Sequence, residues 1–494
     1  MASRTDRTYR IISRARRSGA GFMTDKPCSP IRMTLRVYDT RMREKRELST
    51  LEEGKVSMYV CGITPYSPSH LGHARCYLAF DVVHRWLEAS GYDVDYVQNF
   101  TDIDDKILDI SDAEGVDYSV VANRNIEDYL DVMDAMNVLR ADHYPRVTET
   151  ISEIIEMISV LQDKGHAYVG DDGVYFEIDT VPEKFGQLTG QTLDMVRAGA
   201  GGRVADTGSG KRDHRDFALW KLAKPGEPSW ESQWGEGRPG WHIECSAMSL
   251  NHFGEQFDIH GGGHDLRFPH HEAEIFQSEC CTGREPVVGF WMHNGFVNVD
   301  GEKMSKSLGN FWTIREAFQN HTPLALRYAL LSVPYRNPID LTPEFLEDAA
   351  MHFERLIEAY GKSLSSHADS GTDLSGASER FAAAMNDDFN TRAAIIEVQA
   401  VVSAEYGSEV AAWLEKHAGE VLGLLPDSEE VLAGLAKADS AREEVAVRVE
   451  ALLKERETSR ESKDWARADE IRDELASMGV VVEDGPDGPA WRLT

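Results

Sequence analysis

A short loop in the second half of the chain carries two lysines and two hydroxyl groups at close spacing. Residues 303–307 read Lys-Met-Ser-Lys-Ser, and a glycine stands near each end of this stretch. Lys303 and Lys306 are suited to a loop that closes over a polyphosphate, because ammonium groups neutralise phosphate oxygens. Basic loops are common on protein surfaces, so this string alone is a weak signal.

A second candidate phosphate site lies far upstream, where residues 69–73 read Ser-His-Leu-Gly-His. The first turn of a helix offers unpaired N–H groups and the positive end of the helix dipole, which together favour an anion. Gly72 has no side chain and lets a nucleotide approach the backbone. His70 and His73 share a helix face, where imidazoles can hydrogen-bond phosphate oxygens as charge builds on them. In this order, the two strings predict a nucleotide-activating site.

Cysteine, histidine and glutamate side chains form a candidate metal site. Cys61 ends an apolar stretch beside the phosphate loop, and Cys245 lies much further along the chain. His270 and Glu274 are four residues apart and point the same way on a helix. Two thiolates, one imidazole and one carboxylate can form a tetrahedral zinc site. The alternative is buried free thiols with ordinary helix-face residues. The other cysteines compete as ligands: Cys28, Cys76, Cys280 and Cys281.

Alternating strand and helix patterns must position these side chains. Residues 56–61 read as a buried strand, 70–88 as a helix with Ser69 as N-cap, and 94–100 as the next strand. A strand–helix–strand order predicts an α/β fold with a parallel sheet and a site at the carboxyl ends of the strands.

The pattern changes several times along the 494 residues, which are too many for one core. The predicted segments are a doubtful or disordered N-terminal extension (1–33), the first half of a Rossmann-like catalytic domain (34–126), a connective insertion (127–238), the second half with the lysine loop (239–323), a helical bundle (324–425) and a small C-terminal domain (426–494).

The chain is strongly acidic, with 84 Asp and Glu against 52 Lys and Arg and a formal net charge of -32. Such a charge repels nucleic acid unless salt screens it, and at ~1 M salt the Debye length is only about 3 Å. We therefore predict a halophilic origin, with an acidic mesophilic protein as the alternative. The arginine-rich residues 1–33 indicate an over-extended start, a disordered arm or a transit peptide.

The remaining composition indicates a cytoplasmic protein. Six cysteines in a chain of this length do not form a disulfide framework. No apolar run is long enough to span a membrane.

Several motifs together resemble the cysteinyl-tRNA synthetase family of class I aminoacyl-tRNA synthetases. They lie at residues 61–66, 70–73, 99–106, 216–221, 240–248, 260–263 and 269–272. The resemblance runs from about Leu35 to the C-terminus. It implies a class I Rossmann-like parallel-sheet catalytic domain with an insertion, followed by an α-helical anticodon-binding bundle and a small C-terminal domain. With the acidic composition, it points to a halophilic archaeon.

The resemblance implies a cysteine–tRNA ligase that activates L-cysteine with ATP and transfers it to the 3′ end of tRNA(Cys). The implied catalytic residues are His70, His73, Lys303 and Lys306, and the implied ATP-binding residues are Gly72, Lys303, Ser305 and Lys306. One Zn²⁺ per chain is implied at Cys61, Cys245, His270 and Glu274, with Mg²⁺ accompanying ATP. The cysteine pocket would comprise Cys61, Thr64, Trp241 and His260. Its zinc would bind the substrate thiolate, so no editing site is expected.

Two rival functions stay open at this point. One is a ligase that joins activated cysteine to an amino-sugar and lacks the tRNA-reading tail. The other is a catalytically inactive RNA-binding paralogue. The tail resembles the family most closely around Trp465 and Trp491, whose rings could stack on bases, with Arg467, Arg472 and Arg492 taking phosphates. The alternative is that the tryptophans pack between helices and that the arginines belong to a charged face exposed to solvent. We expect a monomer.

Overall fold

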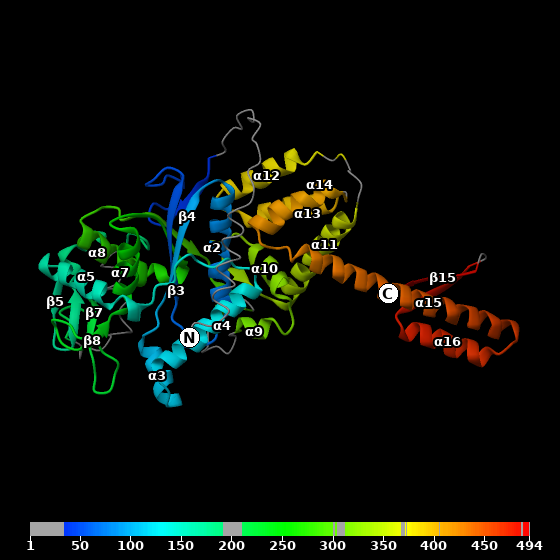
Figure 1. Cartoon of the computed structure of the whole chain (residues 1–494), viewed down its shortest axis with the longest axis horizontal. Helices are drawn as coiled ribbons and strands as arrows, with labels where there is room; N and C mark the ends of the chain where they lie inside the picture. The colour runs from blue at the N-terminus through cyan, green and yellow to red at the C-terminus, as the bar shows by residue number, and fades with distance from the viewer. Residues whose placement is uncertain are drawn as a thin grey trace. The chain divides into compact units, whose positions relative to one another are not determined.

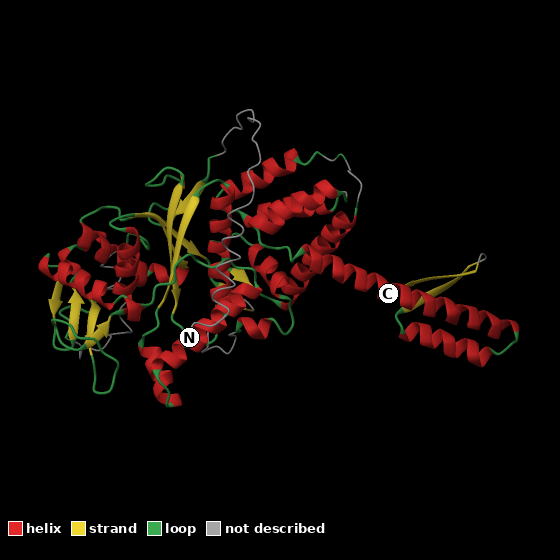
Figure 2. Cartoon of the chain, in the orientation of Figure 1, coloured by secondary structure: helices red, strands yellow, loops and turns green. Residues whose placement is uncertain are grey.

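The computed structural model describes residues 34–190, 210–299, 302–303, 312–366, 371, 373–404, 406–485 and 488–493 (Figure 1). Figure 2 shows how its strands lie among helices. No helix in these ranges is long and apolar enough to cross a bilayer.

A four-stranded parallel sheet with the order β10-β9-β3-β4 forms the centre of the catalytic region. The strands are β3 (Lys55–Ile63), β4 (Asp93–Phe100), β9 (Phe257–Gly263) and β10 (Val288–Asn294). Most residues of β3 are buried, as expected for a parallel strand that is covered on both faces. The prediction of a parallel α/β sheet is confirmed.

The strand order reverses between β3 and β9. From β3 the chain passes through helix α2 (Leu71–Ala89) to β4 on one side. From β9 it passes through helix α8 (His270–Thr282) to β10 on the other. Open α/β sheets bind ligands at such a switch point, outside the carboxyl ends of the strands. The fold therefore places a site at the ends of β3 and β9.

Helix α2 begins one residue later than predicted, because His70 rather than Ser69 is its N-cap. The backbone of Ser69 is engaged elsewhere: its carbonyl accepts a hydrogen bond from the N–H of Ile314 at 2.9 Å. The ring of His70 then accepts from the N–H of His73 at 3.4 Å, and the ring of His73 accepts from the N–H of His70 at 3.4 Å. The two histidines thus cap the helix that they begin.

An antiparallel sheet with the order β5-β6-β7-β8 lies within the predicted insertion. The elements from the end of β4 to helix α7 are α3 (Asp105–Glu114), α4 (Tyr118–Ala135), α5 (Ile151–Asp163), β5 (Ala167–Val169), β6 (Gly173–Phe176), β7 (Phe217–Leu222), β8 (Gly237–Pro239) and α7 (Trp241–Phe253). One apolar cluster joins α5, this sheet, α7 and α8 to β3.

Helices dominate the last third of the chain. The remaining elements are β1 (Arg36–Asp39), β2 (Glu44–Glu47), β11 (Val297–Val299), β12 (Glu302–Lys303), α9 (Ile314–Ala317), α10 (Pro323–Leu331), β13 (Ile339–Asp340), α11 (Pro343–Ser365), α12 (Ser375–Asn386), α13 (Thr391–Val402), α14 (Ser408–Leu414), a π-helical turn (Glu415–Val421), α15 (Ser428–Glu461), α16 (Trp465–Ser477), β14 (Val480–Gly485) and β15 (Gly488–Leu493). A single apolar cluster runs from α2 through α10 to α14. The bounds of the six predicted segments stay a prediction.

Candidate active site and metal centre

The four predicted zinc ligands lie together at the carboxyl end of the sheet. Cys61 is on β3, Cys245 is in the second turn of α7, and His270 and Glu274 are one turn apart on α8. All four are buried, and one ligand atom from each lies within 4.8 Å of the others. The sulfur of Cys61 is 3.5 Å from that of Cys245 and 3.6 Å from Oε1 of Glu274. Nε2 of His270 is 3.2 Å from the same oxygen.

The backbone around Cys61 is shaped to direct its thiol toward this cluster. The register between β3 and β4 shifts between Val60 and Ile63, and such irregularities re-aim side chains. At Gly62 an added Cβ would lie 1.5 Å from the carbonyl oxygen of Asn99, so no larger residue fits. The N–H of Gly62 donates to Oδ1 of Asn99 at 2.8 Å, and this oxygen is also 3.7 Å from the sulfur of Cys245. Asn99 therefore supports both cysteines, a role that the sequence did not reveal.

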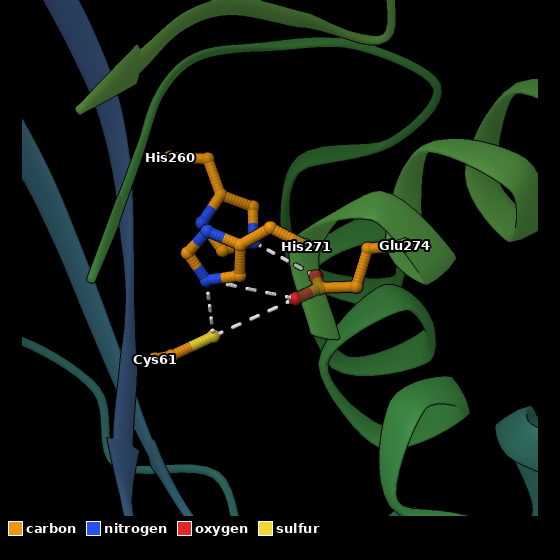
Figure 3. A group of neighbouring side chains, drawn as sticks. All are labelled: Cys61, His260, His271 and Glu274. Carbon is orange, nitrogen blue, oxygen red and sulfur yellow. Dashed lines mark hydrogen bonds and ion pairs between the residues drawn. The ribbon is translucent and has the colours of Figure 1, made fainter. Parts of the chain in front are cut away.

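Two further histidines extend the cluster (Figure 3). Nε2 of His260 lies 2.8 Å from Oε2 of Glu274, and Nε2 of His271 lies 3.3 Å from the sulfur of Cys61. Cys61, His260, His271 and Glu274 form a second buried group with ligand atoms within 4.8 Å of one another. Both groups share Cys61 and Glu274, so they are parts of one centre.

Burial keeps His270 and His271 of this centre neutral. It lowers the pKa of His270 and of His271 well below the usual value. Burial also lowers the pKa of His242 to about 4. Nδ1 of His242 lies 3.0 Å from Nδ1 of His270, which leaves Nε2 of His270 facing the cluster. Neutral imidazoles are suitable metal ligands.

The thiols need a cation to ionise. Burial raises the pKa of Cys61 well above its usual value, and the neighbouring Cys245 and Glu274 raise it further. A divalent ion would reverse this effect, because it stabilises thiolate and carboxylate together. Nδ1 of His260 is also buried without a hydrogen-bond partner in the described ranges. The donor set fits a metal ion that accepts sulfur, nitrogen and oxygen ligands.

Three of the four predicted cysteine-pocket residues belong to this centre or contact it: Cys61, His260 and Trp241. Trp241 is 38% exposed, and its ring lies 4.4 Å from the ring of His270, between centroids. His260 stacks on Trp291, with centroids 4.5 Å apart and planes at 18°. Thr64 follows β3 directly and is half-buried. Trp241 thus forms an accessible edge of an otherwise buried centre.

The first turn of α2 holds the predicted phosphate-binding histidines. His70 and His73 stack with their ring centroids 3.7 Å apart, and both are half-buried, as is Gly72 between them. The N–H of Leu71 donates to the carbonyl of Trp312 at 3.2 Å. The segment that follows the lysine loop therefore pairs with the start of α2.

The lysine loop itself is only partly described. The backbone of Lys303 pairs with Asn298 of β11. Ser305, Lys306 and the side chain of Lys303 lie outside the described residues. The described flanks of the loop are thus Lys303, paired with β11, and Trp312, bonded to the first turn of α2.

The three competing cysteines in the described ranges are not part of the centre. Cys76 and Cys280 are buried and Cys281 is half-buried, and none belongs to a metal-ligating group in the described ranges. Cys28 lies outside those ranges.

The fold and the site define a class I aminoacyl-tRNA synthetase. The family model for the tRNA synthetases class I (C) catalytic domain matches residues 47–351. A methionyl-tRNA synthetase from Mycobacterium tuberculosis, solved with methionyl-adenylate, is similar in fold, with a TM-score of 0.53 at 16% identity over 76% of this chain and 89% of that one. A leucyl-tRNA synthetase of Agrobacterium radiobacter K84 gives a TM-score of 0.52 at 11% identity, over 78% and 88%.

The particular family follows from closer relatives. The model for the cysteinyl-tRNA ligase anticodon binding domain matches residues 442–492. Cysteine–tRNA ligases of Chromobacterium violaceum and Thermococcus onnurineus are each 46% identical, covering 93% of this chain and 99% of their own length. That of Salmonella agona is 47% identical with the same coverage. The chain belongs to the cysteine–tRNA ligase family and is an enzyme of that family. The halophilic origin stays a prediction.

Proposed function

We propose that the chain joins cysteine to tRNA(Cys) in two steps. In the first, a carboxylate oxygen of L-cysteine attacks the α-phosphorus of ATP, forming cysteinyl adenylate and releasing pyrophosphate. In the second, a ribose hydroxyl at the 3′ end of the tRNA attacks the carbonyl carbon and releases AMP. The observation that carries the proposal is the buried Cys61–Glu274 centre, set at the end of the strand that leads into the His70 helix.

We propose Zn²⁺ as the ion of this centre, held by Cys61, Cys245, His270 and Glu274. Zinc would supply a soft Lewis acid that prefers a thiolate to a hydroxyl. This preference distinguishes cysteine from serine, a near-isostere that pocket shape alone rejects poorly. Cys61, Thr64, Trp241 and His260 are proposed to line the cysteine pocket.

The proposed phosphate machinery acts by position and charge. His70, Gly72 and His73 hold the nucleotide at the first turn of α2, and Mg²⁺ accompanies ATP. Lys303, Ser305 and Lys306 are proposed to contact its phosphates and the departing pyrophosphate. The cytoplasmic location and the monomeric state stay predictions.

ATP–pyrophosphate exchange tests the proposed function. The exchange rate with cysteine is compared with the rate with serine, before and after zinc is removed by a chelator. Each measurement is made at low salt and at ~1 M KCl. We expect exchange that depends on cysteine and is lost on chelation. Charging of tRNA(Cys) then tests the second step. Folded, zinc-loaded protein without exchange at either salt concentration would refute the proposal.

Replacing His73 with asparagine is expected to lower the exchange rate by roughly 10²-fold, the usual effect of losing one donor to a developing anion. Asparagine can still accept from the N–H of His70 and so preserves the cap. The melting temperature and the zinc content should therefore match the wild type. Wild-type exchange by this variant would show that the imidazole takes no part.

Trp465 is the described residue best placed to stack on a tRNA base, because it is 59% exposed at the start of α16. Replacing it with alanine is expected to weaken tRNA binding by about 5- to 150-fold, given ~1–3 kcal/mol per stacked base. Cysteine-dependent exchange should not change. Tyr406, 48% exposed and outside the C-terminal domain, provides the control substitution to alanine. Equal effects of both substitutions on tRNA binding would contradict stacking.

A further inference from the structure

A second group of metal-ligating side chains lies away from the active site. Asp95 is on β4 and His252 is in the last turn of α7, while His143 belongs to the segment between α4 and α5. One ligand atom from each lies within 4.8 Å of the others. Asp95 pairs with Ser57 of β3, toward the amino end of the strand, whereas Cys61 lies toward its carboxyl end. The two groups therefore occupy different ends of the sheet.

The three side chains make close contacts. Nε2 of His252 is 3.2 Å and 3.0 Å from the two carboxylate oxygens of Asp95. Nε2 of His143 is 3.8 Å from one of these oxygens. The two imidazole rings lie 4.5 Å apart between centroids. Both imidazoles thus turn the same nitrogen toward one carboxylate.

The backbone holds these residues in place. The N–H of His143 donates to the carbonyl of Tyr96 at 3.2 Å, and the carbonyl of His143 accepts from the N–H of Gln98 at 3.0 Å. His143 therefore runs beside β4 like an added strand. His252 is fixed by its helix, and its ring packs edge-on against Phe253 at 4.7 Å. The three candidate metal ligands therefore lie close together although they come from three separate parts of the chain.

The spacing suits a metal ion. Tetrahedral zinc with bonds of ~2.0–2.1 Å to nitrogen and oxygen sets its ligand atoms about 3.3 Å apart. The distances from the carboxylate oxygens of Asp95 to Nε2 of His252 and of His143 are 3.0 Å and 3.8 Å, one shorter and one longer than that value. A divalent ion at this position would use all three side chains as ligands.

Solvent can complete the coordination. The side chains of His143, Asp95 and His252 are 55%, 51% and 27% exposed. Both histidines line a cleft of ≈ 260 Å³ together with Met248 and Asn251. A site with three protein ligands and an open position binds water or an exogenous ligand in the fourth place.

We propose that Asp95, His143 and His252 bind a second divalent transition-metal ion, with zinc as the best-matched ion. The site does not depend on the proposed chemistry at Cys61. Helix α7 carries Cys245 near its start and His252 near its end, seven residues or about 10.5 Å apart at the helical rise. An ion bound by His252 and Asp95 would link β4 to α7, the helix that carries Cys245.

Metal stoichiometry tests the proposal. The untagged full chain is dialysed against buffered Zn²⁺, and the zinc per chain is measured by mass spectrometry. We expect two ions in the wild type and one in the double variant His143→Gln/His252→Gln. The control is His352→Gln, which removes a half-buried histidine 3.7 Å from a carboxylate oxygen of Asp348 and should leave two ions.

Cobalt substitution keeps the result interpretable. The thiolate-to-cobalt absorption of the Cys61 centre should be the same in the wild type and in the double variant, which shows that the variant is folded. Equal zinc contents in the wild type and in the double variant would overturn the proposal.

Discussion

Replacing Cys245 with serine is expected to release zinc from the buried centre and to lower cysteine-dependent exchange by more than about 100-fold. Even the loss of an outer hydrogen-bonding partner costs 10–100-fold in metal affinity, so the loss of a direct ligand should cost more. A hydroxyl also ionises far less readily than a thiol, and its oxygen bonds zinc at a shorter distance than the ~2.3 Å of sulfur. The measurements are zinc content and exchange rate.

Cys280 offers a matched control, because it is a buried cysteine on the same helix as His270 and Glu274. The Cys280→Ser variant should keep its zinc and exchange at the wild-type rate. A Cys245→Ser variant that retained zinc and activity would disprove this ligand assignment. If zinc were lost but exchange persisted, the ion would serve the fold rather than cysteine recognition.

The zinc centre shows what the sequence could predict. The spacing of His270 and Glu274 already placed them on one helix face, but the two cysteines are 184 residues apart and only the family resemblance joined them. His271 was missed because neighbouring residues on a helix point about 100° apart, which argues against a shared centre. The structure brings His271 to Cys61 because α8 packs its start against the end of β3. That packing is a tertiary contact, which periodicity does not encode.

The prediction of Ser69 as the N-cap of α2 was wrong for a similar reason. Serine is a better N-cap than histidine by local preference, yet Ser69 pairs its backbone with Ile314, far along the chain. A local rule was overridden by a long-range hydrogen bond. The fold class could be predicted because the strand–helix–strand order is local, whereas the pairing of β3 with β9 joins residues some two hundred positions apart.

A buried ion pair between α2 and α10 was also hidden from the sequence. The guanidinium of Arg327 contacts a carboxylate oxygen of Asp81, and both side chains are fully buried. Nε of Arg85 is 2.9 Å from the same oxygen. Arg327 also donates to the backbone carbonyls of Leu422 at 2.7 Å, Met136 at 3.0 Å and Asn137 at 2.9 Å. The pair thus ties α2, which begins with the phosphate-binding histidines, to the helical bundle.

The charge state of Asp81 depends on these partners. Burial alone would raise the pKa of Asp81, but Arg85, Arg327 and the N–H of Leu139 outweigh burial and hold the pKa below its usual value. A carboxyl of this kind contributes stability above its unfolded pKa of about 3.9, and the contribution is lost as the pH falls through the folded value. We therefore expect the stabilising contribution of Asp81 to decline as the pH falls below about 4.

Replacing Arg327 with methionine is expected to lower the free energy of unfolding by about 3–5 kcal/mol at neutral pH, because it leaves a buried carboxylate with one partner fewer. Denaturant titration measures the change. The exposed pair of Arg124 and Glu114, 2.6 Å apart, provides the control, since Arg124→Met should cost at most ~1 kcal/mol.

A double variant, Asp81→Leu/Arg327→Met, separates the two roles of Arg327. Removing both charges leaves no buried carboxylate with a missing partner, and Arg85 keeps its hydrogen bonds to the carbonyls of Glu420 and Asn137, so the double variant should be more stable than Arg327→Met alone. It should stay below the wild type, because the carbonyls of Leu422, Met136 and Asn137 still lose their donor. If Arg327→Met cost no more than Arg124→Met, the apolar cluster shared by α2, α10 and α14 would alone account for the attachment of the bundle.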